Sequence, residues 1–404
     1  MLKVASKATR QQTKLHNSRL ILKNVYARGP ISRADISRLT NLTATTVSNI
    51  IAEQISEGLV EEVGSVSIER GKPPTLISII DNARLLIALD LSRDDFTGAV
   101  MNLRGEILAE QSEPIYDHST RNCEENDPLT TVYHLIDSLL SETATNLLGI
   151  GIGAPGIIDI HSGIVRHASN LGWNDLMLCE LLLERYGLPT YIVNDNQAVL
   201  LAEHIFGNYE ETPDLIVIRV GRGVGAGIMF NGQLVHGHGS GSGEIGHVVV
   251  DESGELCRCG NVGCLETVIS RPAIVKRAQE IARNYPESRL NEVAGSPESV
   301  NIDSVIQAIN LGDPHLTPLL QDLGDHLGVA IANLIGALGT PRILLCGSVA
   351  QIGQPLLDII EVEVQKRTLN ARINKPKIDV IQSKPNVVLL GAAASLLSNE
   401  LGLF

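Results

Sequence analysis

The sequence contains no run of about twenty uncharged apolar residues, so it predicts no transmembrane helix. Its N-terminal stretch also lacks the apolar segment of a signal peptide, which favours a cytoplasmic protein. Aromatic residues make up only 3% of the 404 positions, although 44% of the residues are hydrophobic and 37 are glycines. This balance is typical of an α/β protein with many glycine turns, and the length predicts two or three domains.

Cysteine is scarce as well, and its distribution argues against a disulfide framework. Of the six cysteines, Cys123, Cys179 and Cys346 are scattered, while three crowd into GEIGHVVVDESGELCRCGNVGCLE at 243–266. Clustering of this kind indicates a metal site in a protein from a reducing compartment.

A histidine lies in the same segment as the clustered cysteines. One nitrogen and three sulfur atoms match a closed, tetrahedral structural zinc site that has no open position for water. Nearby glycines permit the sharp turns that the tight Cys-x-Cys spacing requires. The alternative is three free thiols that lie close together by chance. We predict one structural Zn²⁺ per chain, held by His247, Cys257, Cys259 and Cys264.

Charge is unevenly distributed along the chain. Residues 1–60 hold nine Lys/Arg and three Asp/Glu, a net charge of +6, whereas the whole chain has a formal net charge of -14. The remainder therefore carries -20, so a basic N-terminal head precedes an acidic body. A basic head indicates a polyanionic partner, and the alternative is an ordinary solvated charged face.

The head has the pattern of a helix-turn-helix. Apolar residues at helical spacing over 14–28 end at Gly29-Pro30, and Ser32 then caps a second helix with Asp35 at the capping-box position. Thr43 caps a third helix that runs to about Glu57. One face of this helix is apolar, formed by Val47, Ile50, Ile51 and Ile55. The opposite face carries Thr45, Asn49, Ala52 and Ser56.

Short polar side chains near the start of such a third helix can reach base edges in a major groove. Two alternating runs follow around a glycine-containing turn and predict a β-hairpin wing, whose basic residues are suited to phosphate contact. A protein-interaction module with three helices and a hairpin is the alternative. The candidate DNA-binding residues are Arg33, Thr43, Thr45, Thr46, Asn49, Arg70 and Lys72.

From residue 85 onward, strand and helix patterns alternate, which predicts an α/β body with mixed sheets. Near 205–210 the second half repeats the strand, hairpin and strand with which the first half begins. We therefore expect two similar α/β lobes with a cleft between them. Helices are predicted at about 129–145 and 316–338.

Several motifs of the body, together with the head, carry a family resemblance over essentially the whole chain. They are GAPG at 153–156, ASNLGW at 168–173, VNDNQA at 193–198, VGRGVGAG at 220–227, EIGH at 244–247, CRCGNVGCLE at 257–266 and CGSV at 346–349. The chain resembles the ROK family of repressors, open reading frames and sugar kinases, and specifically its repressor branch.

The resemblance implies an N-terminal winged helix-turn-helix followed by a two-lobe, actin/hexokinase-like ROK domain with sugar bound between the lobes. The predicted domains are the winged helix-turn-helix at 1–80, a first α/β lobe at 81–205, and a second lobe with the zinc site and C-terminal helices at 206–404. By the same resemblance, the sugar contacts are Asn170, Asn194, Asp195, Glu244, His247 and Glu266. A metal cross-link would fix the two flanking glutamates relative to each other, whereas the alternative for each is a solvated surface acid.

The resemblance also bears on catalysis, because Asp195 matches the general base of the family's kinases. Those kinases carry Asp-x-Gly-Gly-Thr in their first phosphate loop, but this sequence has Asp90-Leu91-Ser92-Arg93-Asp94-Asp95 at 90–95. Bulk and added carboxylates there disfavour a triphosphate, so we predict no enzymatic activity. The alternative is an ATP-dependent sugar kinase with a regulatory DNA-binding head, since Gly223, Gly225 and Gly227 of the second loop remain.

The predicted function is a sugar-responsive transcriptional regulator, most simply a repressor of sugar uptake or catabolic genes. Its partners would be double-stranded operator DNA and a sugar or sugar phosphate. Two-fold operators require paired heads, so a homodimer or homotetramer is expected. Some proteins of the repressor branch are controlled by sequestration on a membrane sugar-transport protein, and the sequence leaves this alternative open.

Overall fold

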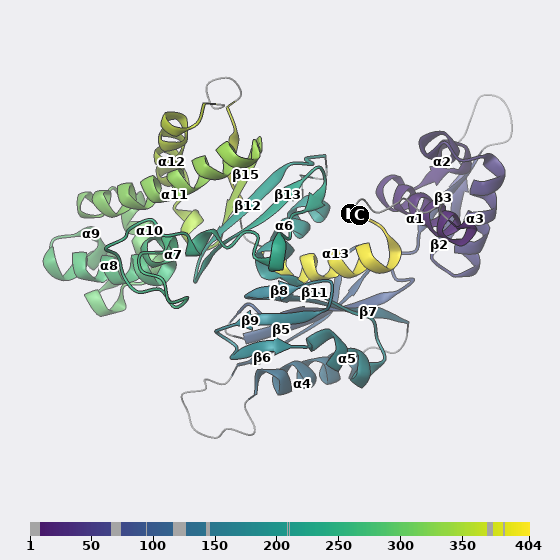
Figure 1. The fold of residues 1–404 in the computed structure, drawn as a ribbon, viewed down its shortest axis with the longest axis horizontal. Helices are drawn as coiled ribbons and strands as arrows, with labels where there is room; N and C mark the ends of the chain where they lie inside the picture. The colour runs from purple at the N-terminus through teal and green to yellow at the C-terminus, as the bar shows by residue number, and fades with distance from the viewer. Residues whose placement is uncertain are drawn as a thin grey trace. The chain divides into compact units, whose positions relative to one another are not determined.

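The chain forms two compact units, Met1–Val193 with Val388–Phe404 and Asn194–Val387 (Figure 1). The computed structural model describes residues 9–65, 74–93, 95–115, 127–142, 146–207, 209, 211–369, 375–382 and 384–404. Among these residues no helix combines the length and apolar character needed to cross a membrane.

The head contains three helices and a small antiparallel sheet. Its helices are α1 (Arg10–Arg28), α2 (Arg33–Thr40) and α3 (Ala44–Ser56). The strands, in the order β1-β3-β2, are β1 (Ile31–Ser32), β2 (Val60–Ser65) and β3 (Thr75–Ile79). This is the arrangement of a winged helix-turn-helix, as predicted. The turn of the predicted wing, with Arg70 and Lys72, lies outside the described residues.

Each helix of the head begins at a hydroxyl cap. The side-chain oxygens of Thr9, Ser32 and Thr43 each accept the backbone N–H three residues later, at 3.2 Å. These bonds satisfy donors that the first turn of a helix leaves unpaired. The predicted caps Ser32 and Thr43 are confirmed, although α1 begins before the predicted residue 14.

The apolar face of α3 was predicted correctly except at its C-terminal end. Val47 and Ile51 are fully buried, but Ile55 is 36% exposed and Gln54 is buried instead, at 2%. Gln54 Nε2 donates to the carbonyl oxygen of Ser18 at 3.0 Å and to its hydroxyl at 3.2 Å. A polar contact with α1 therefore replaces the apolar contact that helical periodicity predicted.

The first large sheet has the order β11-β7-β4-β5-β6. Its strands are β4 (Leu85–Asp90), β5 (Asp95–Asn102), β6 (Ile107–Pro114), β7 (Leu147–Ala154) and β11 (Thr190–Asn194). Helix α4 (Pro128–Ser141) packs against β5 and β6 (Figure 1) and buries Leu135 and Leu139. The same unit contains α5 (Leu178–Tyr186) and a smaller sheet of β8 (Ile157–Asp159), β9 (Ile164–Ala168) and β10 (Trp173–Leu176).

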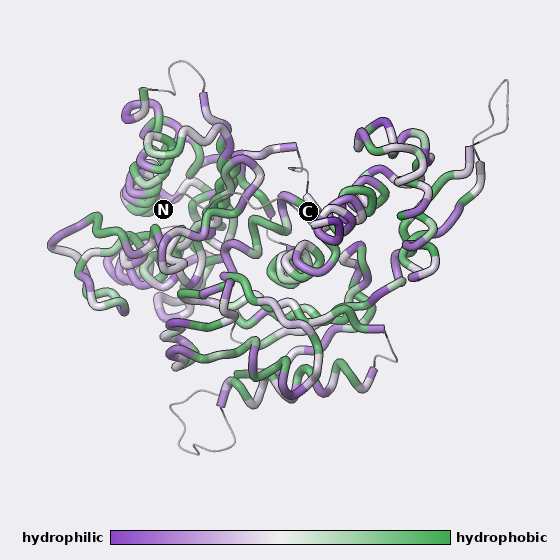
Figure 2. The backbone as a smooth tube through the Cα atoms, turned by 45° about the vertical axis from the view of Figure 1, so that its right-hand side comes forward, coloured by the Kyte–Doolittle hydropathy of each residue, from purple (hydrophilic) through white to green (hydrophobic). Residues whose placement is uncertain are grey.

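The second large sheet has the order β14-β13-β12-β15-β16. Its strands are β12 (Leu215–Val220), β13 (Val224–Phe230), β14 (Gln233–Leu234), β15 (Arg342–Cys346) and β16 (Lys377–Val380). The helices of this unit are α6 (Asp195–Phe206), α7 (Leu265–Ile269), α8 (Arg271–Asn284), α9 (Arg289–Ala294), α10 (Ile302–Asn310), α11 (Thr317–Leu338) and α12 (Gln354–Arg367). Figure 2 shows hydrophobic and hydrophilic residues alternating along the helical coils, as expected when each helix buries one side.

The two large sheets are built alike. In each, the first strand in the chain is central, pairs antiparallel with the second and parallel with the fourth: β4 with β5 and β7, and β12 with β13 and β15. The fifth strand then lies beside the fourth in both sheets. This shared order matches the repeat predicted near 205–210, and the α/β fold class with mixed sheets is confirmed.

Helix α13 (Val387–Leu401) returns the chain to the first unit. It packs against β7, where a Cβ at Gly151 would collide with the carbonyl oxygen of Ala392. At its end, Arg19 Nη2 on α1 donates to the carbonyl oxygens of Asn399 at 2.8 Å and Glu400 at 3.3 Å. The last helix is thereby bonded to the first helix of the head.

The structure divides the chain between 193 and 194, earlier than the predicted 205/206 boundary, and α13 returns to the first unit. Helix α6 belongs with the second sheet because it packs closely on β12 and β13, where a Cβ at Gly225 would overlap the Asn196 amide. The division into domains at 1–80, 81–205 and 206–404 stays a prediction about independently folding parts.

Candidate metal centre and adjoining polar site

The predicted metal ligands come together on a glycine-rich loop of the second unit. His247 ends the short 3₁₀ helix Ile245–His247, and Cys264 immediately precedes α7. Cys257 and Cys259 lie on the loop between them, which is tied by isolated bridges from Val249 to Cys264 and from Leu256 to Val262. The ligand atoms of His247, Cys257, Cys259 and Cys264 all lie within 4.8 Å of one another.

The spacing of these atoms fits a single ion. His247 Nδ1 lies 3.5 Å from Cys257 Sγ, and Cys259 Sγ lies 3.6 Å from Cys264 Sγ. A tetrahedral ion with bonds of about 2.0–2.3 Å separates its ligand atoms by about 3.5–3.8 Å. Burial raises the pKa of the Cys264 thiol to about 12, so a bound cation is what would make it a thiolate at neutral pH. The cluster could therefore hold a metal ion.

The second ring nitrogen of His247 points away from the sulfur atoms. Nε2 lies 3.9 Å from Glu244 Oε2, while Nδ1 faces Cys257. Burial raises the pKa of Glu244; the neighbouring His247 opposes that rise, and the Asp195 and Glu266 carboxylates add to it. The His247 imidazole thus lies between the sulfur cluster and the Glu244 carboxylate.

Glu266 is held by the turn between β12 and β13. Its Oε2 atom accepts the Val224 N–H at 2.9 Å. A Cβ at Gly223 would lie 2.8 Å from the same oxygen, so the absence of a side chain there makes room for the carboxylate. The glycine turn that resembles a phosphate loop therefore donates a backbone N–H to a carboxylate of the protein itself.

Asp195 lies at the start of α6, directly after the strand end that the sequence predicted. Asn194 caps this helix, because its Oδ1 accepts the N–H groups of Asn196 at 2.9 Å and Gln197 at 3.4 Å. Asp195 Oδ2 accepts a hydrogen bond from Arg219 Nη1 at 2.8 Å. Sequence reasoning missed Arg219, although a single charge within the apolar strand LIVIRV was the available signal.

Five of the six predicted sugar contacts belong to the second unit, namely Asn194, Asp195, Glu244, His247 and Glu266. Asn170 is an exposed residue of the first unit. Its participation in a common site stays a prediction.

Of the five candidate DNA-binding residues that the structure describes, three have side-chain partners within the head and two lie on an exposed helix face. Arg33 forms an ion pair with Glu62 at 2.6 Å, and the hydroxyls of Thr43 and Thr46 lie 2.9 Å apart at the cap of α3. Thr45 and Asn49 lie on the exposed face of α3, as predicted. Contact of these residues with bases stays a prediction.

The turn after β4 is the segment whose sequence departs from the first phosphate loop of the family's kinases. Asp90 is only 2% exposed, and its Oδ1 accepts bonds from Ser92 N at 2.9 Å and Ser92 Oγ at 2.6 Å. Asp94 lies outside the described residues. The bonds to Ser92 engage the carboxylate at the end of β4 within the turn.

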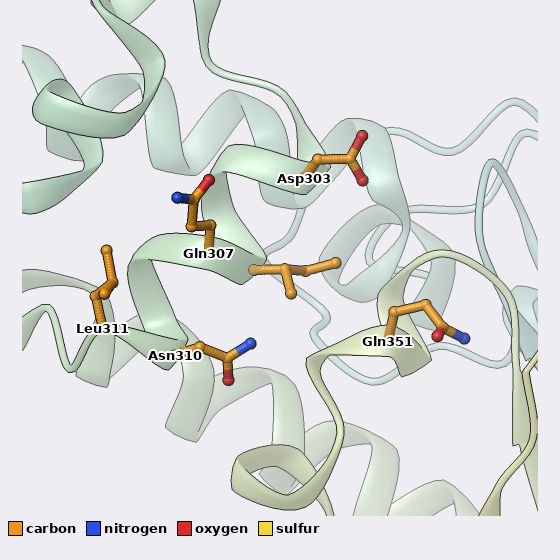
Figure 3. Close-up of a pocket in the computed structure, with 6 residues that line it drawn as sticks. Asp303, Gln307, Asn310, Leu311 and Gln351 are labelled. Carbon is orange, nitrogen blue, oxygen red and sulfur yellow. The ribbon is translucent and has the colours of Figure 1, made fainter.

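A cavity of about 450 Å³ lies elsewhere in the second unit, between α10 and the 3₁₀ helix Val349–Ile352 (Figure 3). It is wide open to solvent and contains one carboxylate, that of Asp303. None of the residues predicted for metal, sugar or DNA lines it. Its lining is Asp303, Ile306, Gln307, Asn310, Leu311 and Gln351.

Residues 86–399 match the model of the ROK family, so the chain belongs to that family. The Xylose repressor of Caldicellulosiruptor bescii is 30% identical over 388 residues, which cover 95% of this chain and 96% of that protein. A crystal structure of a ROK family transcriptional regulator, a homolog of E. coli MLC protein, has a TM-score of 0.85 at 28% identity and covers 97% of this chain and 98% of that chain.

Enzymes of the family share only part of the chain. The ROK family glucokinase from Streptomyces griseus, solved with glucose and AMPPNP, has a TM-score of 0.64 at 25% identity. The match covers 98% of that enzyme but 76% of this chain, whereas the regulator matches nearly all of it. The predicted membership in the repressor branch is thus supported by relatives that share the full length.

Proposed function

We propose that this protein is a sugar-responsive DNA-binding transcriptional regulator that represses genes of sugar uptake or catabolism. The observation that carries the proposal is the exposed polar face of α3, on a chain that also contains the carboxylate site around His247. Thr45 and Asn49 would read base edges in the major groove of an operator. Full-length similarity to a transcriptional regulator and to a Xylose repressor supports this function.

The proposed sugar site consists of Asn194, Asp195, Glu244, His247 and Glu266, with Asn170 from the first unit. Carboxylates are strong acceptors for sugar hydroxyls, and several acceptors fixed relative to one another provide specificity. The bond of Glu266 to Val224 N and its place in the glycine turn keep that carboxylate in position. A sugar bound there would alter operator affinity through the free energy that couples the two sites.

The ion of the metal centre is proposed to be a structural Zn²⁺, one per chain. One imidazole and three thiolates form one of the usual closed sites of structural zinc, and such a site leaves no ligand position for catalysis. His247, Cys257, Cys259 and Cys264 would hold it, and it would fix the loop that carries Glu244 and ends at Glu266. Nε2 of His247 would remain available to the sugar.

We further propose that the protein is not a sugar kinase. The turn at Asp90 and Ser92 supports this proposal, because the Ser92 N–H and hydroxyl already donate to Asp90. A phosphate loop needs free backbone N–H groups. A kinase with a regulatory DNA-binding head is the second candidate, favoured by Asp195 and by the retained glycines around Gly223. Turnover of ATP with any hexose at an ordinary rate would establish that candidate.

The proposed partners are double-stranded operator DNA and a sugar or sugar phosphate. A homodimer or homotetramer would supply the paired heads that a palindromic operator requires. Control by a membrane sugar-transport protein is a further alternative. A cytoplasmic location follows from the proposed DNA partner.

The test is to incubate the purified protein with fragmented genomic DNA, recover the bound fragments, and elute them with a panel of sugars and sugar phosphates. Discrete fragments released by one sugar are expected. The variant Asn49→Ala should lose the fragments while its sugar affinity is unchanged. Specific fragments that no sugar releases would favour control by a partner protein. The absence of specific binding at moderate salt would reject the head as an operator reader.

A further inference from the structure

Arg219 and Asp195 form an ion pair within the proposed sugar site. Arg219 lies on the central strand β12, opposite Gly225 on β13 and Cys346 on β15. The Arg219 and Asp195 side chains are 30% and 13% exposed, so the contact is largely shielded from water. An arginine in the middle of an apolar strand is costly to bury unless a partner compensates for it.

The pair also changes what Asp195 can do. A general base must take up the proton of the reacting hydroxyl. Asp195 Oδ2 accepts a hydrogen bond from a guanidinium at 2.8 Å, and this positive charge stabilises the carboxylate relative to the carboxylic acid. Asp195 is thus suited to accept a hydrogen bond from a sugar hydroxyl without removing its proton.

The charges around the pair bear on the ligand. The three acidic residues lie around the start of β13: Glu266 accepts the Val224 N–H, Gly246 packs on the Val224 carbonyl two residues after Glu244, and Asn196, next to Asp195, packs on Gly225. Arg219 engages the Asp195 carboxylate, which leaves Glu244 and Glu266 to repel an incoming anion. An uncharged polyol avoids this repulsion and still finds several acceptors.

We propose that Arg219 is a positioning residue, which holds Asp195 as an acceptor for an uncharged sugar, and that the Glu244 and Glu266 carboxylates exclude sugar phosphates and sugar acids. The inference rests on the proposed sugar site and deepens it by naming the class of ligand. It extends the proposed function to a residue that sequence reasoning did not single out.

The test is calorimetric titration of the full-length, metal-loaded protein with uncharged pentoses and hexoses, their phosphates and the corresponding uronic acids. One uncharged sugar is expected to bind, with its phosphate and its acid at least about tenfold weaker. Arg219→Gln should weaken that sugar about tenfold or more, and Arg219→Lys should restore part of the affinity. Arg283→Gln, which removes an exposed, ion-paired arginine on α8, is the matched control and should leave the affinity unchanged.

A double-mutant cycle separates positioning from general damage. If the pair acts as a unit, Arg219→Gln combined with Asp195→Asn should bind no worse than the weaker single variant. Tighter binding of a phosphate or an acid, or unchanged sugar affinity in a folded Arg219→Gln protein, would overturn the inference. Binding of no sugar would overturn it too, and DNA-fragment binding by the same preparation would then decide whether the regulator proposal survives.

Discussion

The turn between β4 and β5 and the turn between β12 and β13 follow the central strands of two sheets with the same strand order. In the first, Asp90 accepts two bonds from Ser92, so the carboxylate is used within its own turn. In the second, the Val224 N–H donates a hydrogen bond to Glu266, which lies on a helix more than forty positions later in the chain. One position in a repeated fold thus serves a local structural bond in one unit and a candidate ligand site in the other.

The two turns contact different distant segments. The turn after β4 is bonded to the neighbouring strand β7, because the Leu91 N–H donates to the Gly153 carbonyl oxygen. The turn after β12 depends on α7 and on the loop of the candidate metal centre that leads into it. Changes in that loop should therefore alter the second turn and leave the first unaffected.

The largest effect is expected from Cys264→Ser. Loss of one ligand should release the metal and lower the free energy of unfolding of the second unit by more than about 4 kcal/mol, because a structural ion contributes directly to folding. Metal content by elemental analysis and thermal unfolding would measure both changes. Cys179→Ser, a change outside the cluster, should keep full metal content; an equal loss in both variants would argue against a metal centre.

The second-largest effect is expected from Glu266→Ala. The variant removes a charged acceptor from the β12–β13 turn and should weaken sugar binding about 100-fold, while operator binding stays intact. Titration with the sugar and with operator DNA would measure the two affinities. The control is Glu252→Ala, which removes an exposed glutamate from the loop of the candidate metal centre. Undiminished release of the operator by sugar in Glu266→Ala would show that the site lies elsewhere.

Gly223→Ala tests the same turn without removing the carboxylate. The added Cβ would lie 2.8 Å from Glu266 Oε2, closer than a carbon atom normally approaches, so the carboxylate must shift. A loss of about tenfold in sugar affinity is expected, with little change in the melting temperature. Gly221→Ala adds a Cβ at an ordinary contact distance of 3.9 Å from Ser348 Oγ and should be nearly neutral. Equal effects of the two substitutions would contradict the role given to Gly223.

The smallest effect should come from the turn after β4. Ser92→Ala removes one of the two donors to buried Asp90 but keeps the Ser92 N–H, so it should cost about 0.5–1 kcal/mol of unfolding free energy without changing sugar affinity. Denaturant unfolding would measure the loss, and Ser92→Thr, which keeps the hydroxyl, should recover most of it. A drop in sugar affinity equal to that of Gly223→Ala would mean that both turns serve the ligand.

Features that depend on local sequence could be predicted well. The caps at Ser32 and Thr43, the strand end at Asn194 and the metal cluster all follow from residue types at fixed spacing. The metal cluster was predictable because its four ligands lie within eighteen residues of one another, so little of the fold is needed to bring them together.

Features that depend on a distant partner could not be predicted. Gln54 is buried in place of Ile55 because α1 presents polar groups of Ser18 there, which no periodicity within α3 reveals. Arg219 meets Asp195 only after two elements have packed together. The return of α13 to the first unit is a property of the tertiary fold, and nothing in its own composition indicates it.

Two adjacent residues of α1 connect this helix to two other helices, α3 and α13. Ser18 accepts bonds from Gln54 on α3, and Arg19 donates to the end of α13. A helix of 19 residues spans about 28 Å and bends little over that length. Displacement of the end of α13 would therefore reach α3 through one stiff helix, because the two contact residues are neighbours on α1. A small rotation of α1, without its unfolding, would then tilt α3, the helix proposed to contact DNA.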